Sequence, residues 1–428
     1  MKKNKFLLIL TLLLLMLKLN AQQRNCGTMQ HLQYLKDNDL QLENKMIQNE
    51  IALQSWIQTQ AAFNSMNTTI ISIPVVVHVV YYNSTENIST AQVQSQIDIL
   101  NEDFRRLNAD ASNTPSIFQA VAADTEIEFC LATTDPNGNS TTGITRTSTS
   151  QTSFSTNDGV KYSSSGGVNA WNTAKYLNIW VCDISGGILG YAQFPGGPSS
   201  SDGVVCDYAY FGNIGTATSP YDLGRTATHE VGHWLNLRHI WGDSNCGNDQ
   251  CNDTPIHNTS NYGCPSYPHL STCSGAPIEM TMNYMDYTDD ACMNMFSQDQ
   301  KTRMIAAINT SRSGLLTSNG CSNADYGCTD PTATNYDPAA TYDDGSCTYP
   351  CINGVAVVYT PGSYANENGF TITDCSGAVL ASMTAGAGFN DPCVVLPADY
   401  SVNLTDSYGD GWNLGTLSVN GVTYTILD

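Results

Sequence analysis

Residues 229–239 read His-Glu-Val-Gly-His-Trp-Leu-Asn-Leu-Arg-His, and most expectations for this chain start from them. On a helix, His229 and His233 project from one face, one turn apart. Two imidazoles at that spacing can share one Zn²⁺, and Glu230 beside them can transfer protons. A third histidine, His239, follows the second by six residues. Three protein ligands leave one zinc position for water, which is typical of a catalytic site.

The third histidine can reach the metal only if the helix ends before it and the chain turns back. Such a turn commonly needs a residue with positive φ, for which glycine is the usual choice and asparagine the next most tolerant. We therefore expect Asn236 to make the turn and His239 to remain a ligand. The alternative is two unrelated surface histidines beside a glutamate. The third histidine and the downstream Asn-Tyr-Met-Asp-Tyr at 283–287 argue against it.

Several separated motifs carry a family resemblance. The pattern H-E-x-x-H-x-x-N-x-x-H followed by a methionine turn resembles the metzincin metalloproteases. Three features of the sequence are similar to the pappalysin family: Thr-His-Glu-Val-Gly-His-Trp-Leu at 228–235, Cys-Asn-Asp-Thr-Pro at 251–255, and Cys292 beyond the methionine turn. Its bacterial branch of ulilysin and cytophagalysin is the nearest match, over roughly residues 24–312. Most metzincins have glycine where this chain has Asn236.

The resemblance implies an α+β fold: a metzincin-type domain with a twisted mixed sheet and an active-site helix. It also implies a zinc endopeptidase that is made as a latent zymogen and acts on protein or peptide substrates. The three histidines would hold the zinc, and Glu230 would pass a proton from the attacking water to the leaving amine. Met285 is expected beneath the metal as a packing residue. Tyr287 is expected to stabilise the developing oxyanion, with an ordinary packed aromatic as the alternative.

The chain has 15 cysteines, so at least one lacks an intramolecular partner. Without Cys26, eight remain from Cys130 to Cys292 and six from Cys321 to Cys393. Both counts are even, which favours a domain boundary between the groups, near residues 311–319. The chemistry leaves the pairing open, and we assign no partners to four of the cysteines: Cys130, Cys182, Cys206 and Cys251.

The pappalysin resemblance implies more about particular cysteines. It implies disulfides Cys246–Cys273 and Cys264–Cys292 around the zinc site. It further implies that Cys26 occupies the open zinc position until the precursor is cleaved, because a thiolate is a good zinc ligand. The alternatives for Cys26 are an ordinary disulfide partner or a dispensable thiol.

Acidic residues after the zinc motif suggest a second ion. Asp253 and Thr254, together with Asp243 and Asp249, offer hard oxygen ligands that suit Ca²⁺. The alternative is an acidic, solvated loop. Some arginine-preferring relatives have an acidic residue directly before the cysteine after the methionine turn. This chain has Ala291 there, preceded by two aspartates, so basic and hydrophobic preferences after the scissile bond both stay open.

The composition of the chain limits the classes of partner that it is expected to bind. The net charge is −22, with only 17 Lys and Arg in 428 residues, which argues against nucleic acid and anionic membranes. Residues 1–21 combine early lysines, a short apolar run and a small residue at a cleavage point, which indicates a signal peptide. The run is too short to span a bilayer. We expect export without membrane insertion, and export favours disulfides.

Periodicity predicts the elements around the motif. We expect a pro-segment helix at 30–60, a helix at 91–107, and a zinc helix that starts near 221–225 with Asp222 as its cap. His78 is interpreted as a core or rim histidine. Strands are expected at four places, of which the last is a substrate-binding edge strand: 71–82, 126–131, 176–184 and 189–194.

The C-terminal third is glycine-rich and poor in helical patterns. It predicts a β-sandwich-like module for adhesion or targeting, which binds carbohydrate or cell-surface material. The alternative to the protease is therefore a calcium-dependent extracellular binding or adhesion protein with a secondary or inactive protease domain; the intact Glu230 argues against it. The expected divisions are a signal peptide, a pro-segment, a catalytic domain, a Cys/Asp-rich repeat and the accessory domain: 1–21, 22–66, 67–314, 320–350 and 351–428.

Overall fold

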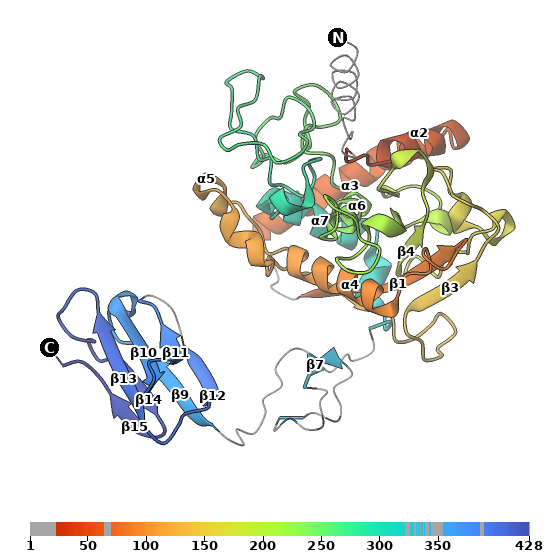
Figure 1. The fold of residues 1–428 in the computed structure, drawn as a ribbon. Helices are drawn as coiled ribbons and strands as arrows, with labels where there is room; N and C mark the ends of the chain where they lie inside the picture. The colour runs from red at the N-terminus through yellow and green to blue at the C-terminus, as the bar shows by residue number, and fades with distance from the viewer. Residues whose placement is uncertain are drawn as a thin grey trace, which may run out of the picture. The chain divides into compact units, whose positions relative to one another are not determined.

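Figure 1 shows the computed structural model, which describes residues 23–63, 70–321, 354–385 and 389–427, with short pieces between 326 and 343. The chain divides into two compact units, Met1–Asn323 and Ala324–Asp428. The expected signal peptide and most of the expected repeat lie outside the described residues, and they stay predictions. Among the helices that are described, none is long and apolar enough to cross a membrane.

A six-stranded mixed sheet forms the centre of the first unit, in the order β2-β1-β4-β6-β5, with β3 also paired to β1. Every pairing is parallel except that of β5 with β6. Strand β1 reads as a continuous apolar run because both faces of the sheet are covered there. The strand bounds are Ile71–Tyr81 (β1), Ile127–Leu131 (β2), Ile144–Ser148 (β3), Leu177–Cys182 (β4), Gly190–Ala192 (β5) and Val204–Asp207 (β6).

Strand β5 ends the sheet, as the sequence predicts for this segment. Helices α4 (Thr90–Phe104) and α6 (Arg225–Trp234) pack against each other, and α6 also contacts β5 and β6. The apolar spacing of α4 buries Val93, Ile97 and Leu100 in the common core. This packing fixes α6 beneath the edge strand.

The prediction that Asp222 caps the zinc helix is wrong. Helix α6 begins at Arg225, and its cap position is Gly224, whose φ of 74° suits glycine. The carboxylate at this helix end comes instead from Asp290, whose Oδ2 accepts the amide N–H groups of Leu223 (2.9 Å) and Arg225 (3.2 Å). A negative charge is favourable at a helix N-terminus wherever in the chain it originates.

The N-terminal segment forms two helices rather than the single one expected. Helix α2 (Thr28–Asn38) ends at Asp39, whose backbone is extended, and α3 (Leu42–Phe63) follows. Helix α3 packs against α7 (Gln298–Thr310), where Leu53 is buried. Apolar residues keep a helical spacing on both sides of Asp39, so the periodicity of the sequence does not reveal that one helix ends there.

The disulfides in which both cysteines are described are Cys130–Cys321, Cys246–Cys273 and Cys264–Cys292. The last two are the pairs implied by the resemblance. The first overturns the argument from even counts, because it joins a cysteine of the earlier group to one of the later group. The first unit therefore extends past the expected boundary at 311–319, to Asn323. Cys182, Cys206 and Cys251 are buried free thiols.

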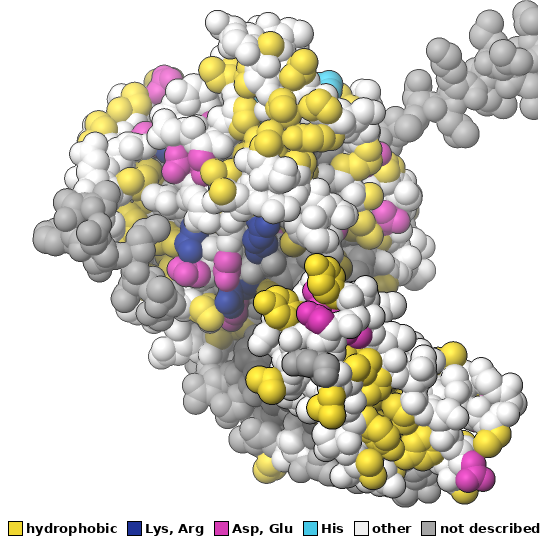
Figure 2. Space-filling view, turned by 90° about the vertical axis from the view of Figure 1, so that its left-hand side faces the viewer, with side chains coloured by type: hydrophobic (Ala, Val, Ile, Leu, Met, Phe, Trp, Pro, Cys, Tyr) yellow, Lys and Arg dark blue, Asp and Glu magenta, His cyan; other side chains and the backbone are white. Residues whose placement is uncertain are grey.

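The second unit is all-β, as expected. Two antiparallel sheets, β11-β10-β13 and β12-β9-β14-β15, share one apolar core that contains Phe370 and Trp412. Large hydrophobic side chains such as Tyr408 and Leu414 remain exposed, and Figure 2 shows hydrophobic side chains gathered on one face. The strand bounds are Tyr326–Gly327 (β7), Tyr342–Asp343 (β8), Val355–Thr360 (β9), Asn368–Asp374 (β10), Val379–Met383 (β11), Asn390–Val394 (β12), Tyr400–Asp406 (β13), Thr416–Val419 (β14) and Val422–Tyr424 (β15).

Candidate active site

Helix α6 places His229 and His233 on one face and then stops. Asn236 adopts φ 71°, as predicted, and its amide donates to the carbonyl of His233 at 2.9 Å. The chain then reverses and brings His239 back to the helix. A left-handed residue at this point is what lets a histidine outside the helix face two inside it.

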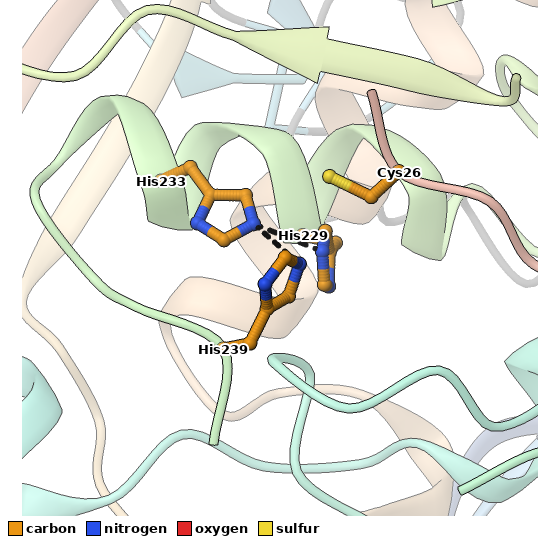
Figure 3. A group of neighbouring side chains, drawn as sticks. All are labelled: Cys26, His229, His233 and His239. Atoms are coloured by element: carbon orange, nitrogen blue, oxygen red, sulfur yellow. Dashed lines mark hydrogen bonds between the residues drawn. The ribbon is translucent and has the colours of Figure 1, made fainter. Parts of the chain in front are cut away.

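The three imidazoles converge through the same ring atom (Figure 3). The Nε2 atom of His233 lies 3.1 Å from the Nε2 atoms of both His229 and His239. Ligand nitrogens about 3.3 Å apart are expected around a tetrahedral zinc ion with Zn–N bonds of about 2.0–2.1 Å. The spacing of the three nitrogens therefore fits zinc.

The opposite ring nitrogens identify the tautomers. Each Nδ1 faces an oxygen acceptor, so the proton lies on Nδ1 and the Nε2 lone pair points inward. Three buried lone pairs aimed at one point repel one another unless a cation lies between them. The acceptors are the Tyr284 carbonyl for His229 (2.7 Å), the Leu237 carbonyl for His233 (2.7 Å) and the Asp243 carboxylate for His239.

Burial keeps the two helix histidines, His229 and His233, neutral. Burial and the neighbouring imidazoles lower the pKa of His229 well below its usual range, and they lower that of His233 to about 3. A neutral imidazole is the form that binds a metal. The chemistry of this donor set thus fits a divalent cation of the zinc class.

Glu230 lies on the same helix, fully buried beneath β5. Its Oε2 atom accepts a hydrogen bond from the Thr28 hydroxyl at 2.8 Å, and burial raises its pKa to about 7. Gly190 of β5 leaves room for it: a Cβ atom there would lie 2.9 Å from the Glu230 Cγ. A carboxyl with a raised pKa beside a metal-binding group is suited to proton transfer.

Cys26 comes from the N-terminal segment and lies over the histidines. Its Sγ atom and one nitrogen of each histidine all lie within 4.8 Å of one another. The backbone beside it pairs with the edge strand, in parallel: the Gly27 amide donates to the Gly190 carbonyl at 2.8 Å, and the Leu189 amide to the Asn25 carbonyl at 2.9 Å. The segment occupies the edge that the sequence assigns to substrate.

Met285 and Tyr287 also lie beside the metal-binding group. Met285 is fully buried, and its Sδ atom packs against Gly232 of the zinc helix. A Cβ atom added at Gly232 would lie only 2.6 Å from this Sδ atom. The Tyr287 ring is 4.9 Å from the His239 ring and 5.8 Å from the His229 ring. Both side chains are therefore placed beside the site where the sequence expects them.

One buried cationic side chain near the site, that of Arg24, was not predicted from the sequence. Arg24 forms an ion pair with Asp290, donates to the Thr288 carbonyl at 3.2 Å and stacks 4.8 Å above the Tyr221 ring. The Asp290 side chain is fully buried. Arg24 precedes Cys26 by two residues, which is the signal that could have drawn attention to it.

Of the four residues proposed for calcium, Asp249 and Thr254 contact each other, whereas Asp243 and Asp253 pair with other groups. Asp243 is the partner of His239, and Asp253 accepts from the Ser297 hydroxyl at 2.7 Å. The Thr254 hydroxyl donates to Asp249. Within the described parts of the chain, the other acidic group with metal-ligand spacing belongs to the second unit: Glu367, Asp406 and Asp410. His78 is fully buried and bonded to Asn178 and Thr145, as a core histidine.

Comparisons with known proteins agree with this geometry. The family model for pregnancy-associated plasma protein-A matches residues 162–309. An extracellular metalloprotease of Arthroderma benhamiae is 30% identical over 250 residues, which cover 57% of this chain and 80% of the relative. Extracellular metalloprotease 1 of Coccidioides posadasii is 39% identical over 145 residues, and that match spans about half of the relative (51%).

Solved structures of mirolysin from Tannerella forsythia are similar as well. The mature enzyme in complex with a cleaved peptide is 56% identical, with a TM-score of 0.57 over 58% of this chain and 96% of that one. A promirolysin mutant is 50% identical, with a TM-score of 0.59 over 68% of this chain and 97% of that one. The fold and the site define a metalloprotease. The chain belongs to the pappalysin family of metalloproteases.

Proposed function

We propose that the protein is a secreted, zinc-dependent endopeptidase that is made as a latent precursor. The observation that carries the proposal is the convergence of three buried Nε2 lone pairs beside a buried carboxyl. The relatives named extracellular metalloproteases support secretion, and the promirolysin structure supports a precursor form. When bound, zinc supplies Lewis acidity, which activates water and polarises a peptide carbonyl.

The chain's own residues supply proton transfer and orientation. Glu230 accepts a proton from the attacking water and delivers it to the leaving amine; its raised pKa suits both steps. Tyr287 donates its hydroxyl hydrogen to the oxygen on which negative charge develops. Met285 packs beneath the histidines and keeps the helix at a fixed distance from the following turn.

The substrate is an extended peptide that pairs with β5. Edge strands bind peptides by adding a strand, and here the N-terminal segment already pairs with β5 at Gly190. The mirolysin structure with a cleaved peptide supports a peptide substrate. Asp290, occupied by Arg24, favours a basic side chain directly after the scissile bond, which was one of the alternatives left open by the sequence.

Latency follows from the position of Cys26. Its thiol lies against the three imidazoles, and Thr28 hydrogen-bonds the proposed base, so neither water nor substrate can reach either group. A thiolate binds zinc well and would fill the position that water needs. Removal of the segment that carries Cys26 and Arg24 frees both the metal position and the Asp290 pocket.

Calcium remains part of the proposal as a structural ion. Asp249 is buried, and burial raises its pKa to about 6, which marks a carboxylate that a cation would stabilise. Thr254 and the carboxylate of Asp253 are close by in sequence. The C-terminal unit is proposed as an accessory module for adhesion, with carbohydrate or cell-surface material as its partner.

The cheapest test separates the protease from the alternative, an adhesion protein with an inactive protease domain. The processed protein should digest casein, a zinc chelator should stop the digestion, and added Zn²⁺ should restore it. Processed protein that carries one bound zinc yet leaves casein intact would favour the adhesion protein.

A further inference from the structure

The N-terminal helix α2 buries a histidine in a pocket of the catalytic region. His31 is completely buried; its Nε2 atom lies 2.9 Å from Oδ1 of Asp158, and its Nδ1 atom lies 3.1 Å from the Ala192 carbonyl oxygen. Its ring packs 4.9 Å from the ring of Tyr191. One helical side chain therefore fills a site made of a carboxylate, a carbonyl and an aromatic ring.

The pocket is built by the catalytic region and not by the N-terminal segment. Asp158 sits at a left-handed position, φ 65°, and is held by the fully buried ammonium of Lys161, 2.8 Å from its Oδ1. The Lys161 ammonium also donates to the Ser201 carbonyl at 2.8 Å and lies 5.0 Å from the Tyr191 ring centre. A buried ion pair of this kind costs desolvation energy, and such groups concentrate at functional sites.

Hydrogen bonding defines what the pocket accepts. Both nitrogens of His31 lie close to oxygens, a main-chain carbonyl and a carboxylate, so the pocket fits a flat ring that presents a nitrogen on each side. Burial and the Lys161 charge lower the pKa of His31, so the ring is neutral and donates from one nitrogen at a time. A longer cation is disfavoured because Lys161 already lies against the same carboxylate. When the N-terminal segment leaves, Asp158 and the Ala192 carbonyl lose the partner that His31 supplied.

Position along the edge strand shows which part of a peptide reaches this pocket. Cys26 lies opposite Gly190, and Arg24 enters the Asp290 pocket on one side of it. His31 contacts Ala192, two residues along β5 in the other direction. If the Asp290 pocket takes the residue after the scissile bond, this pocket takes one before it. Two strand residues span about 6.6 Å, which an extended peptide covers in two residues.

We propose that Asp158, Lys161 and the Ala192 carbonyl form a subsite that, in the processed enzyme, binds a histidine of the substrate two or three residues before the scissile bond. His31 occupies this subsite in the precursor. The inference rests on the proposed function, because it assumes that peptides are cleaved at the three-histidine site.

The first test measures kcat/KM of the processed wild-type enzyme on matched peptides. Each peptide keeps arginine after the scissile bond and carries histidine, arginine, leucine or alanine at the second or third position before it. At one of these positions histidine should exceed alanine by about tenfold, as expected for a hydrogen bond to a charged group. Peptides with a methyl group on either ring nitrogen should lose this preference. A flat profile at both positions, or an unchanged preference after methylation, would overturn the proposal.

The second test changes the enzyme. Asp158→Asn should bring the ratio of histidine to alanine peptides close to one, whereas Asp98→Asn, on the exposed surface of α4, should keep the wild-type ratio. An Asp158→Asn enzyme that keeps the histidine preference contradicts the subsite. Should Asp158→Asn fail to fold, the methylated peptides decide with the wild-type enzyme alone. Absence of any chelator-sensitive cleavage would instead refute the proposed protease.

Discussion

The Cys26 Sγ atom lies 3.5 Å from the Oε2 atom of Glu230, so one thiol contacts the proposed base while it also lies against the three imidazoles. Cys26 itself is buried. These two residues are 204 positions apart in the chain, and the parallel pairing with β5 brings them together. The relationship makes the latency of the precursor testable by single substitutions.

We expect Cys26→Ala to make the uncleaved precursor at least tenfold more active on casein, because alanine cannot fill the metal position. The measurement is a rate on precursor shown by gel to be intact. Thr28→Ala is the matched control: it removes the hydrogen bond to Glu230 but keeps the thiol, so it should stay nearly silent. A Cys26→Ala precursor as inactive as the wild type would show that Cys26 is not the latency ligand.

Glu230→Ala should abolish proteolysis by the processed protein while the zinc content stays near stoichiometric. In the proposed reaction Glu230 exchanges protons with the attacking water and is not a zinc ligand, so its loss removes proton transfer and leaves the metal site. Casein digestion and metal analysis on the same sample test both parts. Loss of the metal together with the activity would give Glu230 a structural role.

Local pattern was enough to predict four of the six strands of the sheet, including the edge strand, and the turn at Asn236, but it missed β3 and β6. These features depend on short-range rules: a continuous apolar run for β1, and a left-handed residue where the chain must reverse. The helix break at Asp39 was missed because the apolar spacing continues across it. Asp222 was chosen as a cap because it is near in sequence, whereas Asp290 performs that role from a distance.

The sequence did not predict which residues far apart in the chain contact each other. Arg24 and Asp290 are separated by 266 residues, and neither has a local pattern that points to the other. Cys130–Cys321 likewise spans 191 residues, so counting cysteines placed the boundary too early. The sequence therefore predicts the zinc-binding motif well, but it does not predict what fills the cleft around it.

Asp290→Asn should weaken the preference for arginine after the scissile bond by about tenfold or more, because the amide keeps the shape of the pocket but not its charge. The neighbouring Asp289→Asn is the control and should leave the arginine-to-leucine ratio of the processed enzyme unchanged. Peptide-library profiling measures both variants. An undiminished arginine preference in Asp290→Asn, or a hydrophobic consensus in the wild type, would refute the proposal that Asp290 favours a basic side chain after the scissile bond.

Acid should loosen the N-terminal segment through Glu50. Its carboxylate on α3 bonds both terminal nitrogens of Arg303 on α7, at 2.9 and 3.0 Å, and this pairing helps to lower its pKa to about 2 although burial opposes the shift. Because the folded pKa lies below the ordinary value near 4.5, the stabilisation is present above pH 4.5 and is lost as the pH falls toward 2.

Glu50→Gln isolates this contribution. The Tm of the wild-type precursor should exceed that of Glu50→Gln above pH 5, and the difference should shrink steadily between pH 4.5 and about 2. Other groups that titrate in this range affect both proteins equally. A difference in Tm that stays constant across the range would show that the ion pair does not stabilise the segment.

Gly232→Ala tests the packing of Met285 against the zinc helix. The added Cβ would lie 2.6 Å from the Met285 Sδ atom, and Met285 is fully buried, so it cannot move aside into solvent. We expect a loss of about 1–3 kcal/mol in the free energy of unfolding and weaker zinc binding, because overpacking displaces helix or methionine. Met285→Ala in the same chain makes room and should restore part of the zinc affinity. Wild-type stability and zinc affinity in Gly232→Ala alone would show that Met285 does not hold the helix in place.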